Sequence, residues 1–127
     1  MNTIKTLTEA CAALGLDETK VIPAFEGFPE KDREAMQAHA ELVLMARALN
    51  FVNGGEWNPD WSNWDEDKFY AWFEMGSPSG AGFRFHNADC WVTDSYVGSR
   101  LSFRSRPLAE YAGKNWTELY RKYFTLQ

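Results

Sequence analysis

The stretch GGEWNPDWSNWDEDKFYAWFEM, residues 54–75, marks the point where the spacing of apolar residues changes. Before it, apolar side chains recur every three or four residues, as in amphipathic helices. Within it, the run FYAWFEM, residues 69–75, is short, aromatic and typical of a β-strand. The stretch also holds four of the six tryptophans. It therefore separates a helical half from a half with strands, and the role of its tryptophans bears directly on function.

Two helices are predicted before this stretch. Residues 3–14 form the first, with Thr3 as its N-cap and Gly15 as its stop signal. Residues 30–49 form the second and longer one, because their apolar residues repeat at spacings of three and four. His39 lies on this apolar stripe, and we interpret it as a buried histidine whose polar atoms have partners.

The second half predicts a small sheet followed by a helix. A helix is expected to begin after Ser105, with Pro107 in its first turn, and to pack on one face of the sheet. Short strands with short links between them indicate an antiparallel sheet of three to four strands, so the fold class is α+β. The strand-like runs are residues 69–75, 82–85, 90–92 and 99–103.

Length and composition limit the class of protein. A chain of 127 residues, 45% of them hydrophobic, is expected to form a single domain over residues 1–127. Its helical part covers residues 1–52, and its sheet and C-terminal helix cover residues 53–127. Two cysteines, and no apolar run long enough for a leader peptide or a membrane span, predict a cytoplasmic protein that makes no membrane contact.

Charge is unevenly distributed along the chain. Residues 53–99 carry two basic and eight acidic residues, whereas residues 100–127 carry six basic and two acidic residues. Either these two segments face each other in the fold, or the basic one binds a partner. The overall net charge of −5 disfavours extensive contact with nucleic acid.

Three segments together carry a resemblance: EWNPDWSN (56–63), KFYAWFEM (68–75) and SRLSFRSRPLAEYAGKNWTELYRKYF (99–124). They resemble a family of small bacterial proteins that travel with prophages and related mobile elements. That family typically reads W-x-P-D-W-x-N, then an aromatic block, then S-R-L-x-F-x-S-R-x-L-A-x-Y-x-G. The resemblance implies a phage or mobile-element origin and a cytoplasmic setting, and it carries over no catalytic residues.

Motifs for metals, cofactors and catalysis are weak. The acidic run that begins at Asp60 lacks the glycine and the final glutamate of a calcium-binding loop, and no close Cys or His pairs predict zinc. No glycine-rich phosphate-binding motif occurs. His86 and Cys90 are a candidate pair for nucleophilic catalysis, although a buried strand cysteine is the commoner interpretation. We therefore predict no metal, no cofactor and no catalytic site.

Arginines in SRLSFRSR, residues 99–106, are the candidates for binding nucleic acid. If residues 99–103 form a strand that continues beyond Phe103, alternation places Arg100 and Arg104 on one face. Together with Arg106, they have the chemistry to contact phosphates or stack on bases. The alternative is that they pair with carboxylates of the acidic segment.

Tryptophans 57, 61 and 64 lie in a segment without a clean period, unlike Trp72, whose alternation predicts sheet packing. The segment is either a lid over the core or a binding surface for a host or phage protein. Sugar stacking, with Tyr70 and Asn63 contributing, is a further alternative. The sequence as a whole favours a non-enzymatic protein-interaction module, with nucleic-acid binding through the arginines as the alternative. The predicted protein-binding residues are Trp57, Asp60, Trp61 and Trp64.

Overall fold

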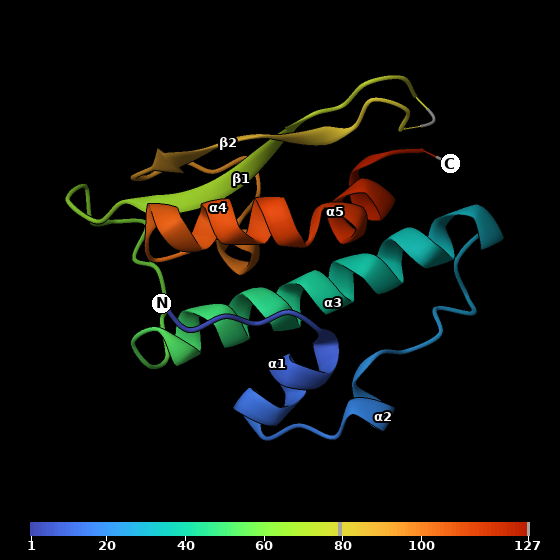
Figure 1. Ribbon diagram of the computed structural model, residues 1–127, viewed down its shortest axis with the longest axis horizontal. Helices are drawn as coiled ribbons and strands as arrows, with labels where there is room; N and C mark the ends of the chain where they lie inside the picture. Colours follow the sequence, from blue (N-terminus) through green and yellow to red (C-terminus); the bar gives the residue numbers. More distant parts are fainter. Residues whose placement is uncertain (79, 127) are drawn as a thin grey trace.

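The computed structural model describes residues 1–78 and 80–126. Figure 1 shows the hairpin of two strands on one side of the molecule, then α4 and α5, then the long α3, with α1 and α2 on the far side. This arrangement of helices with an antiparallel sheet confirms the α+β class. In chain order the elements are α1 (Leu7–Leu14), α2 (Glu18–Val21), α3 (Glu30–Val52), β1 (Lys68–Glu74), β2 (Arg84–Trp91), the 3-10 helix η1 (Ser99–Leu101), α4 (Arg106–Asn115) and α5 (Thr117–Phe124).

The N-cap of the first helix lies three residues later than predicted. Thr6 is its N-cap, because the Thr6 side chain accepts the backbone N–H of Glu9 at 3.2 Å. Thr3 precedes the helix, so its predicted capping role was wrong. Gly15, with φ 70, ends the helix in the left-handed conformation as expected. The second predicted helix is α3, which continues three residues beyond Leu49.

The sheet contains two strands in the described part of the chain, so the prediction of three to four strands was wrong. The two runs predicted at 82–85 and 90–92 are not separate strands, because Arg84–Trp91 forms one continuous strand, β2, that contains parts of both. Its pairing with β1 has a register shift between Trp72 and Phe73 of β1. The segment 99–103 forms η1 and a single bridge between Phe69 and Phe103. Gly98 has φ 73 and turns the chain there, while the Ser102 hydroxyl donates to the Gly98 carbonyl at 2.9 Å, so a third strand does not form.

The core lies between α3, the α4–α5 pair and the inner face of the hairpin. Trp116 sits at the break between α4 and α5 with 2% of its surface exposed, and its Nε1 donates to the Ile4 carbonyl at 2.9 Å. This bond attaches the N-terminal segment to the C-terminal helices. Burial of large aromatic rings gives a small domain much apolar contact from few residues. The largest fully buried side chains include Tyr120, Phe103, Leu42, Met45 and Leu49.

Asn50 joins α3 to the segment after η1. Its amide nitrogen donates to the Ser102 carbonyl at 3.0 Å, and its amide oxygen accepts the Arg104 backbone N–H at 3.0 Å. Because Asn50 is buried, these bonds satisfy polar groups that water does not reach. The connection between the long helix and the start of α4 therefore depends on this side chain.

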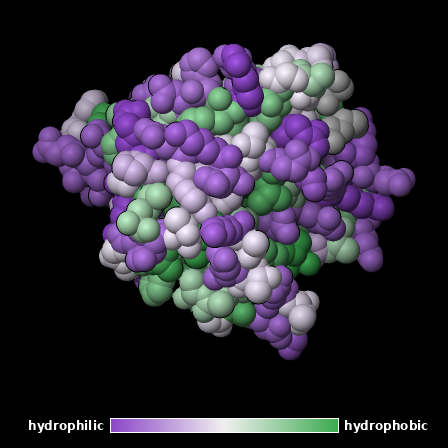
Figure 2. Space-filling view, viewed as in Figure 1, coloured by the Kyte–Doolittle hydropathy of each residue, from purple (hydrophilic) through white to green (hydrophobic). Residues whose placement is uncertain are grey.

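The surface of the molecule is largely polar on the face that Figure 2 draws. Figure 2 shows one face on which hydrophilic side chains predominate and hydrophobic ones form small separate patches. Among residues 1–78 and 80–126, no helix has the length and apolar character needed to cross a membrane.

Gly113 provides a test of how α4 packs on the sheet. A Cβ at this position would overlap the Phe85 ring and approach the Ala71 Cβ to 3.0 Å. We expect Gly113→Ala to lower the free energy of unfolding by about 1–3 kcal/mol through overpacking, although alanine favours helices by about 1 kcal/mol. Urea unfolding measures the change. Lys114→Ala, at the exposed neighbouring position, is the control and should leave stability within about 0.5 kcal/mol. A stabilised Gly113→Ala protein would contradict the packing.

His39 provides a test of pH dependence. Its ring is half-buried and stacks on Tyr123 with 4.4 Å between ring centroids, and burial lowers the pKa of the imidazole. The unfolded chain therefore binds a proton at His39 more readily than the folded chain does. The free energy of unfolding should fall as the pH drops below about 6.5. His39→Gln should make this fall shallower, by a fraction of the roughly 1.4 kcal/mol per pH unit that one proton gives at most. The measurement is urea unfolding at pH 7 and pH 5. His86→Gln is the exposed control, and a shallower fall there instead would contradict the assignment.

Candidate functional site

The tryptophan loop, residues 56–66, is held by a lysine that is entirely buried. Lys68 has 0% of its surface exposed, and its Nζ donates to the carbonyls of Val92 at 2.7 Å and Asn63 at 3.1 Å. The Glu66 carboxylate lies 3.7 Å from the same nitrogen, and the Trp61 ring centroid lies 5.3 Å from it. Two carbonyls, a carboxylate and an indole face thus surround the ammonium, which is how a buried cation avoids a large desolvation cost.

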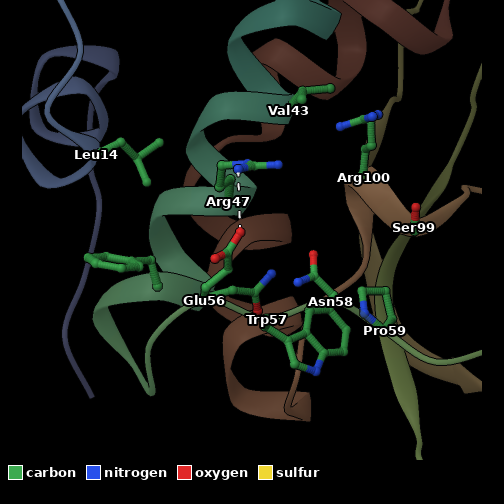
Figure 3. Close-up of a pocket in the computed structure, with 11 residues that line it drawn as sticks. Leu14, Val43, Arg47, Glu56, Trp57, Asn58, Pro59, Ser99 and Arg100 are labelled. Atoms are coloured by element: carbon green, nitrogen blue, oxygen red, sulfur yellow. Dashed lines mark ion pairs between the residues drawn. The ribbon is translucent and has the colours of Figure 1, made fainter.

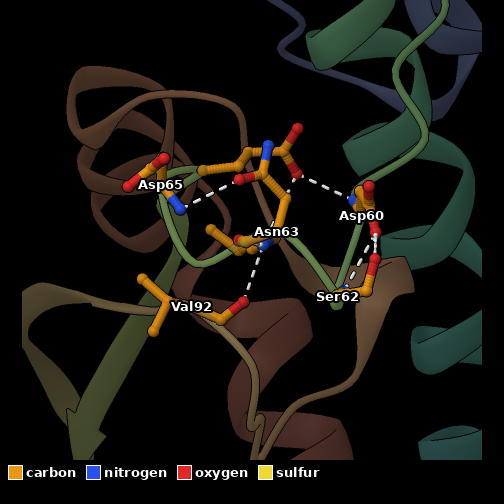
Figure 4. A network of polar contacts seen from close by, with 7 residues as sticks. Asp60, Ser62, Asn63, Asp65 and Val92 are labelled. Carbon is orange, nitrogen blue, oxygen red and sulfur yellow. Dashed lines mark hydrogen bonds and ion pairs between the residues drawn. The ribbon is translucent and has the colours of Figure 1, made fainter.

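Polar contacts within the loop fix its course (Figure 4). The Glu66 side chain accepts the backbone N–H of Asp60 at 2.8 Å. Asp60 accepts the hydroxyl of Ser62 at 2.6 Å and its backbone N–H at 2.9 Å, and these bonds lower the pKa of the Asp60 carboxyl. The Asn63 side chain accepts the backbone N–H of Asp65 at 2.9 Å. Asp60, which we predicted to contact a partner, is therefore exposed but engaged in a turn.

The structure separates the predicted tryptophans. Trp61 is half-buried over the Lys68 ammonium, and Trp57 is half-buried in the wall of a pocket beside α3. Trp64 has 72% of its surface exposed. The loop therefore covers the buried Lys68 ammonium with Trp61 and leaves Trp64 exposed to solvent.

The three predicted arginines also have different surroundings. Arg104 donates through Nη2 to the Gly55 carbonyl at 2.6 Å. Arg106 donates to the Ala88 carbonyl and lies over the Phe69 ring at 5.3 Å. Arg100 is exposed in η1 and makes no hydrogen bond or ion pair with the described residues. The strand that was to place Arg100 and Arg104 on one face does not exist, so that part of the prediction was wrong.

A second surface lies on the outer face of the hairpin, opposite the helices. Tyr70 stacks on Trp91 with 5.8 Å between ring centroids, and Trp91 meets Tyr96 edge to face at 4.7 Å. Together with Trp72 and Met75 they line an open apolar groove of about 450 Å³, called here the aromatic groove. Tyr96 is 85% exposed and Trp72 is 41% exposed. The sequence assigned Trp72 to sheet packing and did not predict the groove. Its one signal in the sequence was the alternation that places Trp72 on the same strand face as Tyr70.

The only charged side chain that lines the aromatic groove, among the described residues, is Asp89. Its carboxylate accepts the backbone N–H of Cys90 at 2.8 Å and makes no ion pair with the described residues. Burial, followed by the charge of Asp89, raises the pKa of the Tyr70 hydroxyl, so Tyr70 stays neutral. The groove therefore combines aromatic surface with one unpaired negative charge.

The candidate pair of His86 and Cys90 is divided between the two faces of the hairpin. The His86 ring lies 4.2 Å from the Trp72 ring on the outer face, and its Nδ1 is 3.0 Å from a Glu74 carboxylate oxygen. Cys90 is opposite Phe69, whose side chain belongs to the inner face. Burial raises the pKa of the Cys90 thiol, which disfavours the reactive thiolate.

In the part of the chain that the structure describes, no three His, Cys, Asp or Glu side chains are grouped so that they would hold a metal ion. Comparison of the chain with known protein families, curated proteins and solved structures finds no match.

Lys68→Met tests whether the buried ammonium holds the tryptophan loop. Methionine keeps an aliphatic stem but leaves the Asn63 and Val92 carbonyls without their donor. We expect a loss of about 2–4 kcal/mol in the free energy of unfolding, measured by urea unfolding followed by tryptophan fluorescence. Lys114→Met, at an exposed position, should change stability by less than about 0.5 kcal/mol. Equal stability of the two variants would show that the loop does not depend on this cation.

Proposed function

We propose that the protein is a non-enzymatic accessory protein of a phage or mobile element that acts by binding a protein partner through the aromatic groove. The observation that carries the proposal is the groove on the outer face of the hairpin, where the exposed rings of Trp72 and Tyr96 lie with the half-buried Trp91 and the buried Tyr70. Large aromatic residues are enriched in the anchoring positions of protein interfaces. The mobile-element setting is supported by the sequence resemblance alone.

The shape of the groove supports a partner that inserts apolar side chains. The rings of Tyr70 and Trp91 lie nearly parallel, with 8° between their planes, and Tyr96 stands across them at 73°. These contacts hold the rings in place before a partner arrives, so binding orders fewer side chains. The groove is also wide, which suits side chains of a chain segment better than an enclosed small molecule.

The charge of the surroundings supports a basic partner segment. Asp89 lines the groove without an ion pair, and Asp94 nearby in the chain is exposed and without an ion pair in the described structure. The two basic residues of segment 53–99 are already engaged, since Lys68 is buried and Arg84 lies 2.7 Å from a Glu74 oxygen. A lysine or arginine of the partner would gain Asp89 as a counter-ion and the Trp72 face as a cation–π contact.

Nucleic-acid binding receives less support from the geometry. Arg104 and Arg106 donate to carbonyls of the protein itself, which leaves Arg100 as the free member of the predicted set. One free arginine provides little of the phosphate neutralisation that drives such binding.

A random peptide library panned on the immobilised protein tests the proposal. We expect recovered peptides to combine aromatic or aliphatic residues with lysine or arginine. Fluorescence anisotropy of the best synthetic peptide should show about a tenfold loss of affinity for Trp72→Ala and for Tyr96→Ala. Asp89→Asn should weaken binding and reduce its dependence on salt.

Two variants serve as controls for this experiment. Phe28→Ala removes an exposed aromatic ring outside the groove and should bind like the wild type. Trp64→Ala removes the exposed ring of the tryptophan loop. If Trp64→Ala abolishes binding while Trp72→Ala and Tyr96→Ala do not, the binding surface is the loop and the groove assignment is wrong. Failure to recover any peptide whose binding depends on the groove would also contradict the proposal.

A further inference from the structure

A pocket separate from the aromatic groove lies between α3, the start of the tryptophan loop and η1. It has a volume of about 280 Å³, and it is lined on one side by α3 and on the other by Ser99 and Arg100. Leu14 at the end of α1 and Trp57 of the loop complete the wall. This volume accommodates a group of about the size of one amino-acid residue.

Several side-chain hydrogen-bond donors of this pocket have no acceptor among the described residues. Arg47 of α3 and Arg100 of η1 extend toward the same space from opposite sides (Figure 3). The side chains of Arg100, Asn58 and Ser99 make no hydrogen bond or ion pair with the residues that the structure describes. Arg47 has one ionic partner, Glu56, at 4.0 Å, and both side chains are more than half exposed. An ion pair of that length and exposure stabilises little, so a ligand can displace it.

The balance of charge selects an anion with a single negative charge. Two guanidinium groups and the one Glu56 carboxylate give the pocket a net charge of +1. A doubly charged phosphate would leave the pocket with a net negative charge, whereas a carboxylate leaves the local charge balanced and matches the planar guanidinium. In a protein with a net charge of −5, this local excess of positive charge sets the pocket apart from the rest of the surface.

Apolar side chains form the rest of the pocket. Val43 and Phe51 of α3 lie on one side, and Trp57 and Pro59 of the loop lie on the other. Such walls favour an apolar group next to the charged one, because burial of apolar surface contributes binding free energy that a bare anion cannot. We infer that this pocket binds a carboxylate attached to an aromatic or branched apolar group, with Arg47 and Arg100 on the carboxylate and Trp57 beside the apolar group.

NMR titration of the ¹⁵N-labelled full chain tests the inference with matched probes. N-acetylphenylalanine should shift the Trp57 indole N–H and the Arg47 and Arg100 side-chain N–H signals in a saturable way. N-acetylphenylalaninamide, which lacks the negative charge, and phenyl phosphate, which carries more of it, should each bind at least about tenfold more weakly. Phenylacetate distinguishes the source of the carboxylate. Tighter binding of phenylacetate identifies a free small acid, and tighter binding of N-acetylphenylalanine identifies the end of a peptide chain.

Variants make the test specific. Arg100→Ala should abolish saturable binding without unfolding the protein, because Arg100 has no partners to lose. Glu56→Gln should strengthen binding severalfold, because it frees Arg47, and a purely structural role of Glu56 would not produce this gain. Arg84→Ala, on the hairpin, is the control for loss of a surface arginine and should bind like the wild type.

Three results would overturn the inference: no saturable shift with any probe, equal binding of the acid and the amide, or unchanged binding by Arg100→Ala. The outcome is independent of the proposed function, since Trp72→Ala and Tyr96→Ala should leave carboxylate binding unchanged. Loss of peptide binding in those variants with retained carboxylate binding would show that the two surfaces are separate.

Discussion

The ammonium of Lys68 is the contact on which the tryptophan loop and the open end of the hairpin depend. It bonds to Asn63 before β1 and to Val92 after β2, so one cation fixes the approach to the first strand and the exit from the second. A lysine buried without acceptors would lose its proton or be expelled to the surface. The loop and the hairpin end therefore have to form together. Because the loop leads back to Trp57 and Pro59, the same cation also positions one wall of the pocket between α3 and η1.

The outer face of the hairpin is left partly open because the helices pack on the other face. The inner residues Phe69, Phe73 and Phe85 fill the space against α4 and α5. Tyr70 and Trp72 lie on the opposite face, where Tyr70 is buried against Trp91 and Trp72 is 41% exposed. Aromatic side chains on an uncovered face would ordinarily be replaced by polar ones in an antiparallel sheet with one solvated side. These aromatic side chains form an apolar surface, and such surfaces commonly mark interaction sites. This is the physical basis of the proposed interface.

Local signals predicted much of the fold, and contacts distant in sequence decided the rest. The spacing of apolar residues predicted α3, Gly15 predicted the end of α1, and Ser105 with Pro107 predicted the start of α4. The third strand failed because Gly98 turns the chain and Asn50, some fifty residues earlier, binds the segment that follows η1. No local pattern indicates such a partner.

The candidate site was less predictable, because exposure of a tryptophan depends on what lies against it. Nothing in the order of residues 56–66 shows that Trp61 covers an ammonium while Trp64 faces solvent. A lysine at the start of a strand is ordinarily assigned to the surface, so its burial was not foreseen. The alternation of Tyr70 and Trp72 was readable, but whether a further layer covered their face was not. Trp57 and Arg100 line one pocket, although the sequence assigned them to different functions. Their proximity depends on the fold and has no local signal in the sequence.

The fold shows which groups the unevenly distributed charges of the chain contact. The basic C-terminal arginines approach the acidic middle segment, but they bind its backbone: Arg104 binds the Gly55 carbonyl and Arg106 the Ala88 carbonyl. Because these two guanidinium groups donate to carbonyls and not to carboxylates, the carboxylates of the middle segment stay unneutralised by them. The acidic residues left without an ion pair in the described structure include Asp65, Asp67, Asp89 and Asp94. The middle segment therefore keeps unpaired carboxylates, with Asp89 lining the aromatic groove, while Arg104 and Arg106 are bound to backbone carbonyls. That asymmetry favours a basic partner at the groove and leaves Arg100, with Arg47, as a small positive site at the pocket.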